Sequence, residues 1–283
     1  VTISNYRNVP ICLKCLNIKK DLVNTFIMES VNSIDINADL GEFRNEKELT
    51  NELNILNYIS SCSVACGGHI GDSDSIKLII DACKEHHIAI GPHPSYPDKE
   101  GFGRRMINID TDDLEKSIRK QIQLFLTIAE SSSMPVSHVK LHGRLYNEAS
   151  KEEKLTNLLF NIVNSFDSNF SIIGPANSLL EHMSKKADIS FVSEAFIDRR
   201  YREDYSLVDR NQEGALLESI EEQINQAKSI VVDQRVLTDT KKHILIKAQT
   251  LCIHSDNPNS LTVVQGVSKM LKAENISIQS YSS

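Results

Sequence analysis

Tryptophan is absent from this 283-residue chain, and aromatic residues make up only 6% of it. Proteins that bind single-stranded nucleic acids stack the bases on aromatic side chains, so this shortage disfavours that class. Basic residues are not in excess either: 31 Lys and Arg stand against 38 Asp and Glu, for a formal net charge of -7. Because nucleic acids and anionic membranes both attract basic surfaces, we expect neither as the main partner.

Long apolar runs are also missing. No run approaches the roughly 20 residues that a membrane-spanning helix needs, and the first residues lack the continuous apolar region of a secretory signal. The 6 cysteines have neither the density nor the spacing of a disulfide scaffold. Cys12 and Cys15 have the spacing of a metal or redox pair, but no second pair follows, and a zinc site there has weak support. These absences indicate a reduced, cytoplasmic protein.

Apolar residues at helical and at strand spacing alternate along most of the chain. Helical spacing recurs at 76–83, 114–129, 155–166 and 263–271, with N-termini expected at Asp72, Thr111, Ser150 and Pro258. Short apolar runs typical of strands occupy 34–38, 64–66, 88–90, 136–141, 171–174, 191–193, 229–232 and 250–253. Strands that alternate with helices indicate a parallel sheet. We therefore predict an α/β fold, a TIM-like parallel β/α barrel of about seven strands.

The first 27 residues differ from the rest of the chain. They are basic and show no clear helical or strand period, whereas a strand follows Met28 within a few residues. No internal repeat or low-complexity linker divides the remainder. We expect residues 28–283 to form a single barrel domain, with Met28 as the natural start and residues 1–27 as an extension that is not part of the core.

Polar residues follow almost every predicted strand. Asp39 and Glu42 follow the first, and the later strands run into His69, His93, His142, Glu194, and His254 with Asp256. In a parallel barrel the carboxyl ends of the strands share one mouth, and active sites sit there. The pattern therefore predicts an enzyme.

The clustered residue types allow two chemistries. One carboxylate with two or three histidines suits a divalent-metal site, for which Asp39, His69 and His142 are the candidates. The same residues also suit metal-free catalysis, with Asp39 as general base and a histidine as acid. Taken singly, each histidine is more often structural than catalytic.

Cations near the predicted mouth indicate an anionic ligand. Lys140 alternates with His138 and His142, and a lysine inside a barrel mouth is costly unless it is paired or meets an anion. Arg104 and Arg105 follow a Gly-Phe-Gly turn, where they form either a clamp on a carboxylate or phosphate or a solvated pair. The chain lacks the spacing of a P-loop and the G-x-S-x-G elbow of serine hydrolases.

Six ordered segments carry a family resemblance: NADLGE at 37–42, ACGGHIGD at 65–72, GPHPSYPD at 91–98 with GFGRR at 101–105, HVKLHGRLYN at 138–147, EAFIDRRY at 194–201 and CIHSD at 252–256. Together they resemble the LamB/YcsF family, the A subunits of bacterial ATP-dependent 5-oxoprolinase. The resemblance runs from about Ile34 to Ile276.

This resemblance implies a seven-stranded, TIM-like barrel related to polysaccharide deacetylases. It implies a hydrolase that, with partner subunits B and C and with ATP as co-substrate, converts 5-oxoproline to glutamate, ADP and phosphate. The catalytic residues it nominates are Asp39, Glu42, His69, His93, Lys140 and His142. The substrate-binding residues it nominates are Arg104, Arg105, Asp198, Arg199, His254 and Asp256.

Five positions depart from the family pattern and bear on substrate fit more than on fold. Gly68 replaces an aromatic residue, Leu141 a proline, Arg144 a small residue, Ser255 a glycine, and Tyr205 stands where a glycine is usual. Two other functions therefore stay open. One is a metal-dependent deacetylase acting on an N-acetylated carbohydrate, with Asp39, His69 and His142 as ligands. The other is a non-catalytic subunit that binds a ligand.

Overall fold

A computed structural model describes residues 31–166 and 169–281 of the chain. Residues 1–27, predicted to be an extension, and the proposed start at Met28 lie outside the described residues. The Cys12 and Cys15 pair also lies outside them. Within the described part, no helix combines the length and apolar character that crossing a membrane requires.

Seven parallel strands form the core, and their order around the sheet is β3, β2, β1, β9, β6, β5 and β4. The strands span Ser33–Leu40 (β1), Ser61–Ala65 (β2), Ala89–His93 (β3), His138–Lys140 (β4), Ser171–Pro175 (β5), Phe191–Phe196 (β6) and Thr250–His254 (β9). A short strand, β10 (Ser277–Ile278), pairs with the start of β1. The prediction of a parallel barrel of about seven strands is confirmed.

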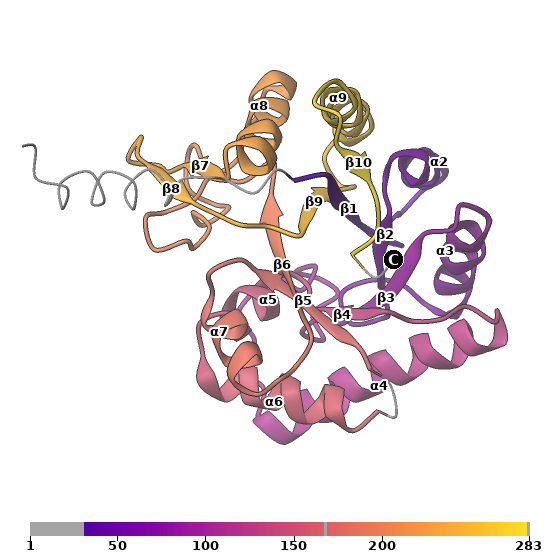
Figure 1. Cartoon of the computed structure of the whole chain (residues 1–283). Helices are drawn as coiled ribbons and strands as arrows, with labels where there is room; N and C mark the ends of the chain where they lie inside the picture. Colours follow the sequence, from indigo (N-terminus) through magenta and orange to yellow (C-terminus); the bar gives the residue numbers. More distant parts are fainter. Residues whose placement is uncertain (1–30, 167–168, 282–283) are drawn as a thin grey trace, which may run out of the picture. The chain divides into compact units, whose positions relative to one another are not determined.

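The two end strands of this order meet and nearly close the barrel, as Figure 1 shows. Ile90 of β3 bridges to Val136 in parallel, and the Ser137 amide donates to the Ile90 carbonyl at 3.0 Å. Gly91 makes this approach feasible, because a Cβ atom on it would lie 2.2 Å from the carbonyl oxygen of His138.

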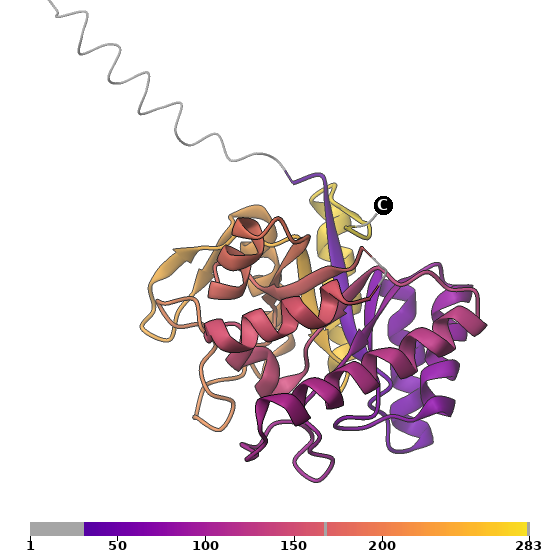
Figure 2. The ribbon, with the colours of Figure 1, turned by 90° about the horizontal axis from the view of Figure 1, so that it is seen from below.

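Helices cover the outside of the ring of strands (Figures 1 and 2). They span Glu46–Ile55 (α2), Ser73–Glu85 (α3), Thr111–Ser131 (α4), Gly143–Ala149 (α5), Glu153–Asn164 (α6), Leu179–Lys186 (α7), Ile220–Val232 (α8) and Ser260–Ala273 (α9). The apolar face predicted for 76–83 is buried in α3, and Asp72 forms a capping box with Ser75. Outside the barrel, β7 (Arg235–Leu237) pairs antiparallel with β8 (His243–Leu245).

Three local predictions were wrong. Residues 229–232, predicted as a strand, form the last turn of α8, where Ile230 and Val231 complete a face buried at helical spacing. Ser150 ends α5, and Glu152 occupies the N-cap of α6 without a side-chain cap. Pro258 precedes α9, which begins at Ser260. A four-residue apolar run fits a helix as well as a strand, and the two helix starts lie within a few residues of the predicted positions, where local sequence is least decisive.

Replacing Gly91 with alanine should weaken the closure between β3 and β4. The added Cβ would meet backbone, which cannot rotate away, so we expect a loss of roughly 1–3 kcal/mol or more in the free energy of unfolding. Gly214→Ala is the reference for backbone strain without a clash, because a Cβ there would find no atom within 4 Å among the described residues while its φ of +72° is strained for any side chain. Urea unfolding curves measure both. A loss at Gly91 no larger than at Gly214 would contradict this account of closure.

Candidate active site

The inner face of β1 is polar, and it supplies the first side chains of the site. Asp35, Asn37 and Asp39 are all buried and contact residues from other strands across the barrel. Asp39 lies closest to the carboxyl end of β1, where its register partners are Ser63 and His254. The predicted convergence of strand ends therefore begins at Asp39.

Lys140, on β4, has its ammonium group buried in the centre of the mouth, with 1% of its side chain exposed. Its Nζ lies 2.8 Å from Asp39 Oδ1, 2.8 Å from Glu194 Oε1, 2.9 Å from Asn37 Oδ1 and 3.2 Å from Cys252 Sγ. Burial alone would lower the pKa of Lys140, but the neighbouring anionic groups, Asp39 first, raise it well above its ordinary value. The group is a permanent cation held by acceptors from three other strands.

Asp39 uses both of its oxygens. Oδ1 accepts from Lys140, and Oδ2 lies 3.3 Å from His93 Nε2. Burial raises the pKa of Asp39, yet His93 and Lys140 outweigh it and hold the pKa well below the usual range. Asp39 is therefore a carboxylate with a fixed orientation.

The rings of His93 and His142 face each other in a way that requires a proton or a cation between two of their nitrogens. Nδ1 of His93 lies 2.9 Å from the Lys140 carbonyl, and Nε2 of His142 lies 3.0 Å from the Phe102 carbonyl. A carbonyl only accepts, so both of these nitrogens carry hydrogen. The remaining nitrogens, His93 Nε2 and His142 Nδ1, are 3.0 Å apart, and two lone pairs cannot face each other at that distance. The pair therefore shares one additional proton, or a cation takes its place.

Carboxylates flank both positions of that shared charge. Asp39 lies beside His93, and Glu42 Oε1 lies 3.2 Å from His142 Nδ1. Burial raises the pKa of Glu42, but His142 and His69 lower it well below the usual range. His69 lies behind His142, with its ring stacked at a centroid separation of 3.7 Å and its Nε2 2.9 Å from Glu42.

Three groups of described residues have donor atoms close enough to hold a metal ion: Asp39, His93 and His142; Glu42, His69 and His142; and Asp39, Cys252 and His254. The predicted metal ligands, Asp39, His69 and His142, do not form one of these groups, because Asp39 and His69 belong to different groups. The first group fits a divalent cation best. Two histidines and a carboxylate are common ligands, and two of their nitrogens already require a positive charge between them.

A second pair of a histidine and a carboxylate lies on the other side of the barrel mouth. His254 Nδ1 lies 2.7 Å from Asp198 Oδ2, and the Phe196 ring stacks on the imidazole at 5.5 Å. Because Nδ1 donates to Asp198, Nε2 is the ring nitrogen left for the pocket that His254 lines. A carboxylate that orients an imidazole in this way suits proton transfer.

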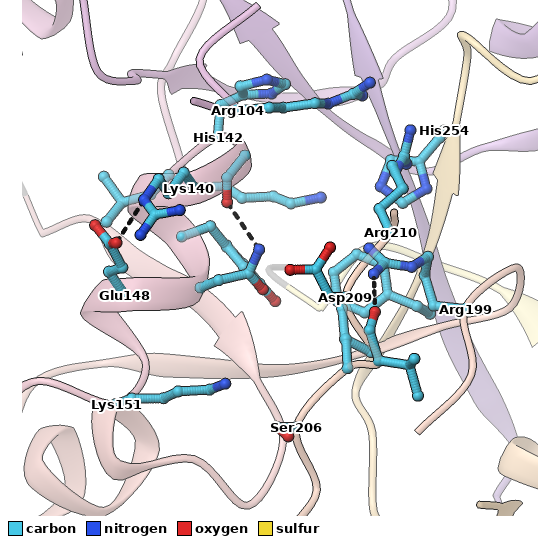
Figure 3. A pocket seen from close by; sticks show the side chains of 18 of the residues that line it. Arg104, Lys140, His142, Glu148, Lys151, Arg199, Ser206, Asp209, Arg210 and His254 are labelled. Atoms are coloured by element: carbon cyan, nitrogen blue, oxygen red, sulfur yellow. Dashed lines mark hydrogen bonds and ion pairs between the residues drawn. The ribbon is translucent and has the colours of Figure 1, made fainter. Parts of the chain in front are cut away.

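Asp39, His93, Lys140, His142 and His254 line a pocket of about 510 Å³, whose wall also carries several arginines. Figure 3 shows Arg104 and His142 on one side, and Arg199, Arg210 and His254 on the other. Arg104 and Arg210 share Asp256, at 2.7 and 3.4 Å.

Arg199 differs from the other arginines of the wall. It is 6% exposed, donates to the Val208 carbonyl at 2.7 Å, and has no carboxylate partner among residues 31–166 and 169–281. A buried guanidinium of this kind is a site for an anion.

The predicted site residues separate into three sets. Those that line the pocket are Asp39, His93, Arg104, Lys140, His142, Arg199 and His254. Those that lie behind them and contact them are Glu42, His69, Asp198 and Asp256. Arg105 does not line the pocket. Its Nη2 lies 2.7 Å from Asp98 Oδ1, and 56% of its side chain is exposed.

Comparison with known proteins gives one consistent assignment. The LamB/YcsF family profile matches residues 34–283. The chain belongs to the LamB/YcsF family. The A subunit of 5-oxoprolinase from Staphylococcus aureus strain JH9 is 33% identical over 247 residues, which cover 87% of this chain and 99% of that protein.

Solved structures agree with this family membership. The lactam utilization protein of Thermus thermophilus superposes with a TM-score of 0.79 at 28% identity, covering 88% of this chain and 100% of that one. A putative cellobiose-phosphate cleavage protein from Enterococcus faecalis V583 has a TM-score of 0.57 at 12% identity, covering 89% of this chain and 98% of that one. The second likeness concerns the fold alone.

The structure locates four of the five departures from the LamB/YcsF pattern, and nothing in it explains the fifth, Leu141. Ser255 donates to the Asp39 carbonyl at 2.8 Å, and so adds a bond at the site. Tyr205 adopts the left-handed φ of +68° that a glycine would adopt more easily. A Cβ on Gly68 would lie 2.3 Å from Gln121 Oε1 and from Ser95 Oγ, so a larger residue there would have to displace these two buried side chains. Arg144 lines the pocket and pairs with Glu148 at 2.6 Å.

Sequence reasoning missed two supporting carboxylates. Glu194 was noticed at a strand end, yet it was not nominated for a role; it contacts Lys140 and accepts from the Tyr146 hydroxyl at 2.5 Å. Glu52, on α2, accepts from the amides of Gly41 at 2.7 Å and Glu42 at 3.0 Å. No local motif marks Glu52, because its partners depend on how α2 packs on the loop after β1.

Glu52 gives a pH prediction. Burial raises its pKa from 4.5 to about 8, so the folded state holds a proton there that the unfolded state releases. The resulting stability is present below pH 4.5 and is lost as the pH rises towards about 8. We compare unfolding free energies of the wild type and Glu52→Gln at pH 5 and pH 8. The wild-type advantage should shrink by at least about 1.4 kcal/mol, the equivalent of one pKa unit. A difference independent of pH would contradict the protonated Glu52.

Proposed function

We propose that this LamB/YcsF protein is the A subunit of an ATP-dependent 5-oxoprolinase, which opens 5-oxoproline to L-glutamate together with subunits B and C. The names of its relatives support the proposal. So does the observation that carries it: the buried Lys140–Asp39 pair lies in the same pocket as Arg199, a buried cation without a carboxylate partner in the described part of the chain. Such a pocket suits a small, strongly anionic amide.

The reaction is demanding because a five-membered lactam has a poor leaving group and its product recloses readily. Transfer of a phosphoryl group from ATP to the lactam oxygen makes the ring carbon more electrophilic. Water then attacks that carbon, the ring C–N bond breaks and the ring nitrogen takes a proton, which leaves an acyl phosphate. A second water hydrolyses the acyl phosphate to the free carboxylate and phosphate. The site must therefore bind an anion, direct water and deliver a proton.

The chain has residues placed for each task. Arg199 and Arg104 bind the anionic groups of the substrate. Asp39, with its orientation fixed by Lys140 and His93, directs the attacking water, and the proton shared by His93 and His142 balances charge as the oxyanion develops. His254, oriented by Asp198, delivers the proton to the ring nitrogen.

A metal ion is compatible with this scheme but is not required by it. Asp39, His93 and His142 are the residues that would hold a divalent cation, and such an ion activates water and polarises a carbonyl oxygen. The proposed compartment is the cytoplasm. The four described cysteines, which are Cys62, Cys66, Cys83 and Cys252, are all free and buried, in keeping with a reducing compartment.

Asp39→Asn and His142→Ala should each lower turnover of 5-oxoproline by at least roughly 100-fold when subunits B and C and ATP are present. The first change removes the charge that orients water, and the second removes the shared proton. Glutamate release measures both. Lys116→Ala is the control, because that lysine is 74% exposed and pairs only with Asp113 on α4 in the described residues. Near-normal turnover in both site variants would reject the assignment.

The Asp198–His254 pair makes a separate prediction. His254→Gln and Asp198→Asn should lower kcat by roughly 100-fold or more with little change in KM, because they remove or misorient a proton donor. Steady-state kinetics with the partner subunits separate the two constants. A raised KM with unchanged kcat would instead make these residues substrate-binding only, as the family resemblance nominates them.

One observation favours a second candidate function. The Asp39, His93 and His142 group would also suit a metal-dependent deacetylase acting on an N-acetylated carbohydrate. Release of acetate without ATP, lost on adding a chelator and restored by a divalent metal, would favour that function. Binding of 5-oxoproline without turnover in either assay would favour a non-catalytic subunit.

A further inference from the structure

A second pocket of about 610 Å³ opens beside the active site and shares no lining residue with the first pocket. The wall between the two consists of Phe102 and the stacked rings of His69 and His142. His142 lines the first pocket, and His69 lines the second. We call the second cavity the Arg44 pocket; the residues that matter here are Phe43, Arg44, His69, Asp72, Lys99 and Phe102.

The two cations of the Arg44 pocket form no ion pair with a carboxylate in the described part of the chain, whereas each of its two acids has a hydrogen-bond or ion-pair partner. Asp72 accepts from the Ser75 amide as the cap of α3, and Glu100 pairs with Arg105 at 3.3 Å. Neither Arg44 nor Lys99 has a carboxylate partner in an ion pair among the described residues. Arg44 and Lys99 are exposed cations that form no such ion pair, so a ligand carboxylate can meet them in this pocket, beside Asp72 and Glu100.

His69 supplies the second recognition element. The residue is 2% exposed, and its Nε2 lies 2.9 Å from Glu42. Its Nδ1 is buried and has no hydrogen-bond partner within residues 31–166 and 169–281. Because Nε2–H donates to Glu42, Nδ1 of the neutral ring is a free acceptor. A buried acceptor left unpaired is unfavourable, and a ligand N–H or O–H would satisfy it.

Phe102 forms the wall and the apolar surface of the pocket. It holds a left-handed φ of +55°, which is uncommon for a bulky residue and is associated with functional sites. The Arg44 guanidinium lies 5.3 Å from its ring centroid and that of Arg104, which lines the first pocket, lies 4.8 Å away. Phe43 also lines the Arg44 pocket.

We propose that the Arg44 pocket is a second ligand site, for a small carboxylic acid that also carries an N–H or O–H donor. The carboxylate meets Arg44 and Lys99, the donor reaches His69 Nδ1, and the carbon skeleton packs on Phe102. Amino acids and lactam acids form this class. The choice of 5-oxoproline and glutamate as test ligands rests on the proposed function, but binding requires neither ATP nor the partner subunits.

Calorimetric titration of the full-length chain with 5-oxoproline and with glutamate tests the site. Arg199→Ala provides the background, because it weakens the first pocket and leaves the second intact. In that background we expect one remaining binding event. The double variant Arg44→Ala with Lys99→Ala should weaken it at least about tenfold, because a charge-assisted contact to the carboxylate is lost. Lys116→Ala and Lys77→Ala are matched controls, since both lysines are exposed and neither lines either pocket. Both controls should bind as the background does.

Nitrogen-15 NMR of labelled histidine supplies a direct second measurement. In the Arg199→Ala background, the ligand should shift the Nδ1 resonance of His69. That resonance is assigned as the signal that disappears from the spectrum of the His69→Gln variant. Inorganic phosphate, an anion without the acid's carbon skeleton, should bind more weakly than the acids. Binding unchanged by the double variant, a His69 resonance that the acids leave unmoved, or tighter binding of phosphate would each overturn the proposal. No oxoprolinase turnover by the wild-type chain with subunits B and C and ATP, with this binding intact, would reject the proposed function alone.

Discussion

The buried ammonium group of Lys140 is the interaction on which the rest of the site depends. An ammonium in a barrel interior is stable only when its charge and its hydrogen bonds are satisfied. Here Asp39 and Glu194 supply the charge and Asn37 supplies a further acceptor, from strands far apart in the sequence. The ion pair therefore fixes the relative position of β1, β4 and β6 at the mouth, and it orients Asp39 for chemistry.

The charge balance around this cation divides the site into two parts. Asp39 and Glu42 each flank the imidazole pair of His93 and His142, so that one additional positive charge there is balanced. Each group of this part has a defined partner, and Asp39, His93 and His142 present their side chains to the pocket in fixed orientations. Across the pocket, Arg199 has no carboxylate partner in an ion pair among the described residues. The division separates residues whose charge is balanced inside the protein from an arginine that a substrate anion can balance.

The loop that carries Phe102 connects the active site to its surroundings. The Phe102 carbonyl accepts a hydrogen bond from His142, and the Phe102 ring separates the first pocket from the Arg44 pocket. The imidazoles of His69 and His142 stack behind the ring, one facing each cavity. An occupant of either cavity would therefore contact the same short wall, which gives the two sites a direct physical connection.

The sequence by itself determined the class of fold and most of the site. Alternating apolar periods specify βα units, and a parallel barrel gathers its strand ends at one mouth, so Asp39, His93 and His142 could be predicted to converge. Tertiary structure alone decided the partners. The Lys140–Asp39 contact spans 101 residues, Glu52 reaches its amides through helix packing, and Arg105 turns to Asp98 instead of the pocket. Local periodicity reports which face of an element is buried, whereas hydrogen-bond partners and unpaired charges depend on the register between distant strands, which no short segment encodes.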